Sequence, residues 1–224
     1  MDEDFELFLN DEGFAPAFDC RPVSEATFNR YQGKLPNKLL EYWRAFGFCG
    51  YGEGLFWIVN PEEFEDVVDA WLEDTPLAGS DNYHVFARSA FGELFMWGEK
   101  GGNSLDILSL YGMLFPTPPT ILIQKGKLDL SLQSFISGQS KDDLDFYDSN
   151  EKPLFKRALK RLGRLEPDEL YGFEPALALG GVEKLENLVK VKAVEHLLIL
   201  AQLSEKEIRE NEAIKALREG RITP

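Results

Sequence analysis

The residues of this 224-residue chain that could carry out chemistry are few and scattered. The chain has two histidines, His84 and His196, and each lies in an apolar stretch without a second metal ligand nearby in the sequence. Such a histidine is more often a packed or hydrogen-bonded core residue than a general base. No HExxH, GxSxG or GxxxxGK[ST] pattern is present, so we expect no catalytic residue, no cofactor and no metal ion.

An enzyme whose site is assembled by the fold is the alternative, because a nucleophile and its base need not be neighbours in the sequence. Glu53, Glu93 and His84 are the candidates for an acid/base pair of this kind. Perturbed carboxylates that converge in one pocket would favour the enzyme, whereas acids scattered over a convex surface would count against it.

The glycines of Gly50-Tyr-Gly-Glu-Gly54 could suggest a phosphate-binding loop. They precede residues 55–59, which we expect to form an apolar strand, whereas phosphate loops join a strand to the N-terminus of a helix. We therefore interpret residues 47–54 as a loop that leads into that strand.

Cysteine content and hydropathy predict a cytoplasmic protein that binds no membrane. Cys20 and Cys49 are too few for a disulfide framework or a structural zinc site, which favours a reducing compartment. The first six residues are acidic, where a signal peptide would be basic and then apolar. The longest apolar stretches, such as residues 197–201, are far shorter than the roughly 20 residues needed to cross a bilayer.

The charge of the chain is strongly negative and unevenly distributed. Lys and Arg number 24 against 39 Asp and Glu, which gives a formal net charge of -15. Residues 1–151 carry 27 acids and 10 bases, whereas residues 152–224 carry 12 acids and 14 bases. A surface of this kind repels phosphate backbones and attracts basic proteins, so we expect a protein partner and no direct binding to nucleic acid.

Seven acids and no Lys or Arg occupy residues 62–74. Asn60 as the cap and Pro61 at the first position predict a helix that runs to about residue 74, with Glu63 able to reach back to the cap. Its apolar side chains share one face. The acids on the opposite face are Glu62, Asp66, Asp69 and Glu73. A solvated face is the simplest explanation, and a docking surface for a basic protein is the functional one.

The remaining pattern predicts an α+β protein with an N-terminal antiparallel sheet and flanking helices, followed by a smaller, mostly helical C-terminal unit. Residues 83–115 have the short apolar runs and turns of an antiparallel meander. Helices are expected at residues 37–46, 129–136, 154–162, 193–203 and 205–219. A capping box from Ser204 to Glu207 would start the last of these. A strand is expected at residues 120–124. A composition shift near residues 138–151 divides the chain into units 1–138 and 139–224.

Several phrases of the sequence resemble a known two-domain family. Tyr31-Gln-Gly-Lys-Leu-Pro36, Leu39-Leu-Glu-Tyr-Trp-Arg44 and Arg88-Ser-Ala-Phe-Gly-Glu-Leu94 resemble the GAD-like domain. Residues 163–181, with His196-Leu-Leu198, resemble the type VI secretion DNase-immunity domain that usually follows it. The helix after Pro36, with the glycine-rich loop and strand, is also loosely similar to the SUKH immunity superfamily.

The resemblance implies a bacterial immunity protein that binds a toxin without catalysis. Its partner would be a cognate basic nuclease toxin delivered by type VI secretion, sequestered in the cytoplasm by a plugged active site or a blocked substrate surface. Our hypothesis is that Glu62, Asp66, Asp69 and Glu73 attract this toxin and form part of the interface, while Trp43, Trp57, Phe91 and Tyr171 pack in the core. A general regulatory or scaffolding module that uses residues 205–219 as a contact is a further alternative.

Overall fold

The main structural element of the protein is a sheet of eight strands. The structure is a computed structural model, and it describes residues 2–210. Its strands follow the order β1-β2-β3-β4-β5-β6-β7-β10, and every neighbouring pair is antiparallel except β10 with β7. The strands are β1 (Phe18–Arg21), β2 (Phe48–Tyr51), β3 (Phe56–Ile58), β4 (Tyr83–Ser89), β5 (Glu93–Gly98), β6 (Gly102–Leu108), β7 (Met113–Pro116) and β10 (Glu207–Ile208). The predicted α+β class and the meander are confirmed.

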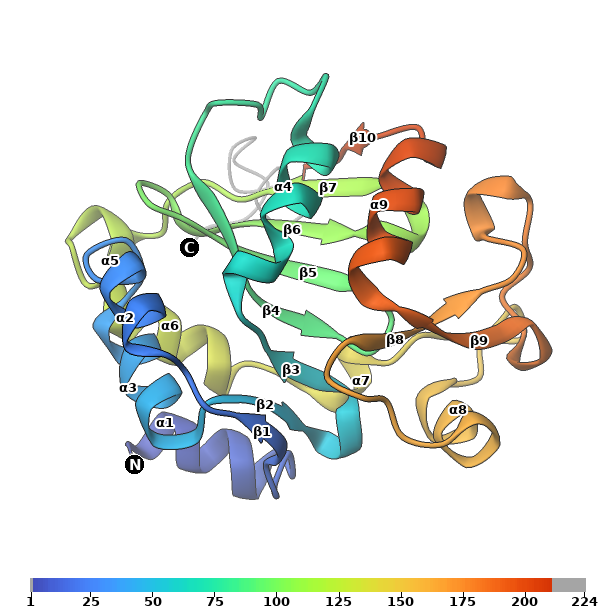
Figure 1. Cartoon of the computed structure of the whole chain (residues 1–224), viewed down its shortest axis with the longest axis horizontal. Helices are drawn as coiled ribbons and strands as arrows, with labels where there is room; N and C mark the ends of the chain where they lie inside the picture. Colours follow the sequence, from blue (N-terminus) through green and yellow to red (C-terminus); the bar gives the residue numbers. More distant parts are fainter. Residues whose placement is uncertain (1, 211–224) are drawn as a thin grey trace, which may run out of the picture.

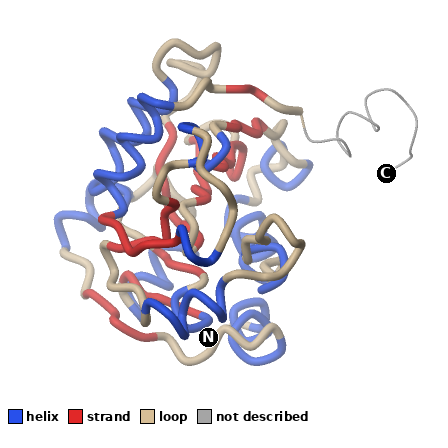
Figure 2. Tube along the Cα trace, turned by 90° about the vertical axis from the view of Figure 1, so that its right-hand side faces the viewer, coloured by secondary structure: helices blue, strands red, loops and turns tan. Residues whose placement is uncertain are grey.

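Helices cover both faces of this sheet. Figure 1 shows α4 (Glu65–Leu72) and α9 (Ala193–Leu203) on one face and α6 (Leu128–Ser137) on the other, and Figure 2, turned by 90°, shows helices on both sides of the strands. Helices α1 (Glu3–Glu6), α3 (Asn37–Phe46) and α5 (Ile121–Gln124) contact α6, and α2 (Glu25–Tyr31) packs on Trp43 of α3. Successive residues of a strand point to opposite faces of the sheet. Phe95 of β5 points to the face that α6 covers, and its ring packs on that of Phe135 of α6, with ring centroids 5.2 Å apart.

The core is unusually aromatic. Trp43, Trp57, Trp71 and Trp97 are each exposed by 1% or less. The four residues predicted to pack, Trp43, Trp57, Phe91 and Tyr171, are all buried, as expected. The buried apolar side chains form one continuous cluster that extends from α1 to α9.

The C-terminal region is smaller and mostly helical, as predicted, and it packs closely on the sheet. It contains α7 (Lys141–Leu144), α8 (Phe155–Leu162), α9 and a hairpin of β8 (Glu169–Phe173) with β9 (Leu188–Lys192). The indole of Trp71 on α4 donates a hydrogen bond of 3.2 Å to the carbonyl of Leu197 on α9. A main-chain hydrogen bond of 2.9 Å from Tyr171 to Ala90 joins β8 to the end of β4.

Three local predictions are wrong. Residues 48–51, expected in a loop, form β2, because pairing with both β1 and β3 satisfies their main chain despite the glycines. Residues 121–124, expected as a strand, form α5, whose first turn is capped by the Thr120 side chain. Ser204 ends α9 and Glu207 enters β10, so no capping box forms there, and the rest of the helix expected to residue 219 lies outside the described residues.

The two cysteines form a disulfide, which corrects the expectation of reduced thiols. Cys20 lies on β1 and Cys49 on β2, and the pairing of these strands brings their Cα atoms to 4.2 Å. The sequence did not predict this bond, because the register of β1 against β2 depends on contacts of the whole sheet.

Candidate partner-binding site

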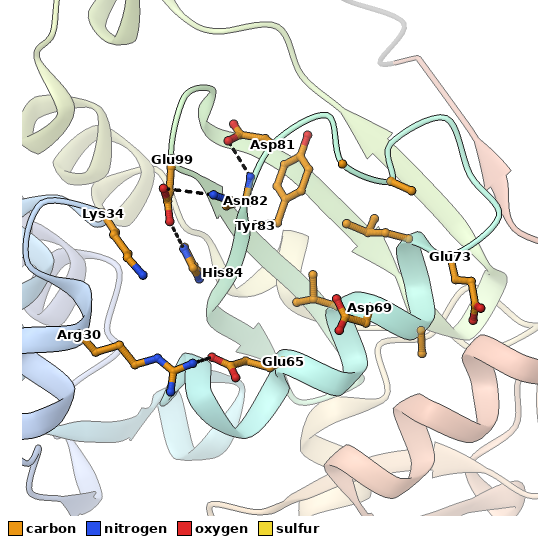
Figure 3. A pocket seen from close by; sticks show the side chains of 15 residues that line it. Arg30, Lys34, Glu65, Asp69, Glu73, Asp81, Asn82, Tyr83, His84 and Glu99 are labelled. Carbon is orange, nitrogen blue, oxygen red and sulfur yellow. Dashed lines mark hydrogen bonds and ion pairs between the residues drawn. The ribbon is translucent and has the colours of Figure 1, made fainter.

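A broad groove opens between α4 and the segment that leads from α4 into β4 (Figure 3). Its volume is about 820 Å³, and its charged lining is mostly acidic. The charged and polar lining residues labelled in the figure are Arg30, Lys34, Glu65, Asp69, Glu73, Asp81, Asn82, Tyr83, His84 and Glu99.

Helix α4 positions the acidic side chains along this groove. Asn60 caps the preceding turn by accepting a hydrogen bond from the main-chain N–H of Glu62, and Pro61 occupies the first position. That turn, Pro61–Phe64, is a 3₁₀ helix, and α4 itself begins at Glu65. The apolar face of α4 is buried on the sheet and on α9, so its acids project outward.

The acidic side chains in the turn before α4 and at its start are paired with arginines. Arg30 of α2 forms ion pairs with Glu62, at 3.3 Å, and with Glu65. Glu63 does not reach back to the cap, because its carboxylate accepts two hydrogen bonds from Arg21, at 2.8 and 2.9 Å. Glu62 is therefore the member of the predicted acidic set whose charge is already neutralised.

The other three predicted residues present free carboxylates. Asp66, Asp69 and Glu73 are exposed, and their side chains form no hydrogen bond or ion pair within residues 2–210. Asp69 and Glu73 line the groove, whereas Asp66 lies on the same helix outside it. The structure thus brings together three of the four predicted residues as a surface of exposed carboxylates without side-chain partners, here called the acidic face of α4.

The acids on the opposite wall serve the fold. Asp81 accepts hydrogen bonds from the main-chain N–H groups of Lys100 and Gly101 and thereby shapes the turn between β5 and β6. Glu99 lies 3.0 Å from the imidazole of His84. Burial alone would raise the pKa of Glu99, but hydrogen bonds with His84 and Asn82 outweigh burial and hold this pKa below its usual range.

The three candidates for an acid/base pair lie in three different places. His84 lines the groove and contacts Glu99, and Glu53 forms an exposed ion pair with Lys156 of α8. Glu93 lines a separate, smaller cavity near α7, where burial raises its pKa to about 8. They therefore do not form a common acid/base pair. His196 is partly buried against Gly172 of β8, in agreement with a packed histidine.

Within the described part of the chain, no group of three or more His, Cys, Asp or Glu side chains is arranged to hold a metal ion. No helix between residues 2 and 210 is long and apolar enough to cross a membrane.

Comparisons with known proteins agree with the two-part organisation. Residues 3–111 match the GAD-like domain, and residues 129–204 match the C-terminal domain of the T6SS immunity protein Tdi1. The crystal structure of Atu4351 from Agrobacterium tumefaciens is similar, with a TM-score of 0.82, 25% sequence identity and 92% of each chain covered. None of the curated proteins matches the chain. The boundary predicted at residues 138–139 stays a prediction.

Proposed function

We propose that this chain, which belongs to the two-domain T6SS immunity proteins with a GAD-like domain followed by a Tdi1-type C-terminal domain, acts by binding a cognate toxin. In this proposal the toxin is a DNase delivered by type VI secretion, and the immunity protein meets it in the cytoplasm. Binding alone holds the toxin inactive, and no reaction is catalysed.

The acidic face of α4 is the observation that supports this mode of action. The carboxylates of Asp66, Asp69 and Glu73 are exposed and form no ion pair within the described residues, so they are free to meet a partner; the ammonium group of Lys206 binds the main-chain carbonyls of Ala70 and Glu73 and leaves these carboxylates unpaired. A DNase must present cations to the phosphates of its substrate, and an acidic protein can occupy the same surface. The carboxylates would thus speed encounter and compete directly with DNA.

Glu62, Asp66, Asp69 and Glu73 do not contribute equally to the attraction of the toxin in this proposal. Glu62 is already paired with Arg30, so its attraction for a toxin is weaker than that of Asp69 or Glu73. Binding of the toxin through Glu62 would require Arg30 to be displaced or shared.

Charge reversal tests the proposal. A D66K/D69K/E73K variant is expected to bind a catalytically inactive form of the cognate DNase effector more weakly than the wild type. Its affinity is also expected to depend less on salt, because exposed charges are screened over about 10 Å at 0.1 M ionic strength.

A D11K/E12K/E174K variant is the matched control, because these three exposed acids lie away from α4 and the net charge changes equally. Equal losses in both variants would show that only total charge matters. Unchanged affinity and salt dependence in the α4 variant would contradict a role for this face.

A further inference from the structure

A second cavity, of about 120 Å³, lies between the start of β5, the turn before β7 and the loop after α7. Residues 89–111 of its lining belong to the GAD-like match and residues 143–146 to the C-terminal match, so both domains build it. The lining residues with polar side chains are Ser89, Glu93, Ser109, Tyr111, Asp143 and Asp145. This lining contains three carboxylates and no Lys or Arg.

The interior of the cavity contains polar atoms that lack partners. Ser109 is exposed by only 1%, and its Oγ has no hydrogen-bond partner among the described residues. The carboxylate of Glu93 is partly buried in the cavity lining and forms no hydrogen bond or ion pair with residues 2–210. Buried polar groups are almost always paired in native proteins, so the unpaired hydroxyl of Ser109 indicates a position that a donor from another molecule fills.

The acidic residues near Glu93 favour the binding of a cation beside it. Burial, then Asp106 and Asp143, raise the pKa of Glu93 to about 8. The β5–β6 register pairs Phe95 with Asp106 and Glu93 with Leu108, so Glu93 and Asp106 lie on the same face of the sheet. Burial raises the pKa of Asp106 to about 7, and its Oδ1 has no partner in the described structure.

Asp145 and Asp143 are better satisfied than Glu93. Asp145 accepts hydrogen bonds from the main-chain N–H groups of residues 146, 154 and 155. Asp143, an exposed residue, accepts one from the hydroxyl of Ser140, at 2.6 Å. Glu93 is therefore the interior carboxylate left without compensation.

The entrance suits a long side chain with a charged end. Tyr111, exposed by 42%, and exposed Asp143 lie at the opening, and the Tyr111 ring stacks on Phe146 at 5.6 Å. A single water needs only about 10–15 Å³, so the cavity has room for more than one water. Aromatic walls suit the aliphatic stem of a lysine or arginine, whose charged end would meet Glu93.

We propose that this cavity receives one lysine or arginine side chain of the partner, with the Glu93 carboxylate as its counterion and Ser109 as a hydrogen-bond acceptor. The proposal rests on the proposed toxin-binding function, and it adds a second contact to the acidic face of α4. The exposed acids of α4 attract the toxin, and the cavity fixes its position.

The first test uses model cations and does not depend on the toxin. The wild-type protein is titrated with n-butylguanidinium, n-butylammonium and uncharged n-butanol while amide NMR signals are followed. We expect saturable shifts at Glu93, Ser109 and Asp143 with one or both cations, none with butanol, and their loss in Glu93→Gln. The cation that binds distinguishes arginine from lysine. Absence of saturable shifts with both cations in the wild type would overturn the proposal.

The second test uses the inactive effector. Glu93→Gln is expected to weaken binding by roughly 30-fold or more, as is typical when one partner of a buried charge pair is removed. Asp142→Asn, an exposed acid of α7 outside the cavity, is the control and should bind as the wild type does. Thermal unfolding should show that Glu93→Gln is at least as stable as the wild type, since it removes an uncompensated buried acid.

The outcomes separate the two proposals. If the wild type does not bind the effector, the proposed function fails. If the wild type binds and Glu93→Gln binds equally well, the function stands and the cavity proposal is overturned.

Discussion

The guanidinium of Arg88 donates a hydrogen bond of 2.8 Å to the main-chain carbonyl of Glu169. Arg88 lies on β4 of the GAD-like domain and Glu169 begins β8 of the C-terminal domain, so this bond joins the two. The same guanidinium donates to the carbonyl of Pro167 at 2.9 Å and lies 5.1 Å from the ring centroid of Trp57. Arg88 is fully buried, and burial lowers its pKa to about 9.

Arg88→Met is expected to destabilise the protein, because the two partly buried carbonyls of Pro167 and Glu169 lose their donor. A buried acceptor left unpaired costs about 1–3 kcal/mol, and urea denaturation should show a loss in this range. Arg44→Met, at an exposed arginine, is the control. A wild-type midpoint for Arg88→Met would show that the hydrogen bonds of Arg88 do not contribute to stability.

The stability of the free protein should fall as pH rises from about 5 to above 8. Glu93 and Asp106 have native pKa values raised to about 8 and about 7, so the native state retains protons that the unfolded chain has already lost. The stabilisation is complete below the ordinary carboxyl pKa and is lost as pH passes the raised values.

The Glu93→Gln/Asp106→Asn variant isolates this effect. Each unit of pKa shift corresponds to about 1.4 kcal/mol, so the wild type should lose on the order of 5 kcal/mol more than the variant between pH 5.5 and 8.5. Parallel pH profiles in urea denaturation would mean that these carboxyl groups titrate normally.

Binding of the toxin should release protons near neutral pH. Free Glu93 is mostly protonated below its pKa of about 8, and a cation seated beside it would favour the ionised form. Calorimetry at pH 7 in buffers of different ionisation enthalpy should therefore detect release of most of one proton, and affinity should rise with pH up to about 8. Glu93→Gln should abolish the release, and equal proton counts in both proteins would refute the pairing.

Strong local patterns in the sequence predicted much of the fold. The helix predicted at residues 37–46 is confirmed as α3 (Asn37–Phe46), which begins directly after Pro36 and ends at Gly47. The antiparallel meander was predictable from the turns between its strands. Strand β2 was missed because its stability comes from pairing with β1 and β3 and not from its own glycine-rich residues.

The candidate site was predictable only in part, for a similar reason. Helical spacing identified Asp66, Asp69 and Glu73, but the compensation of Glu62 depends on Arg30, which belongs to a separate helix. The walls of the cavity at Glu93 come from segments more than thirty residues apart, and no local pattern connects them.

DNA cleavage by the proposed DNase effector, measured with increasing amounts of the immunity protein, is the decisive experiment. We expect that cleavage falls in proportion to the immunity protein added, that it stops once the effector is saturated, and that D66K/D69K/E73K needs a higher concentration. Full cleavage in the presence of excess wild-type protein would show that this protein does not neutralise a DNase.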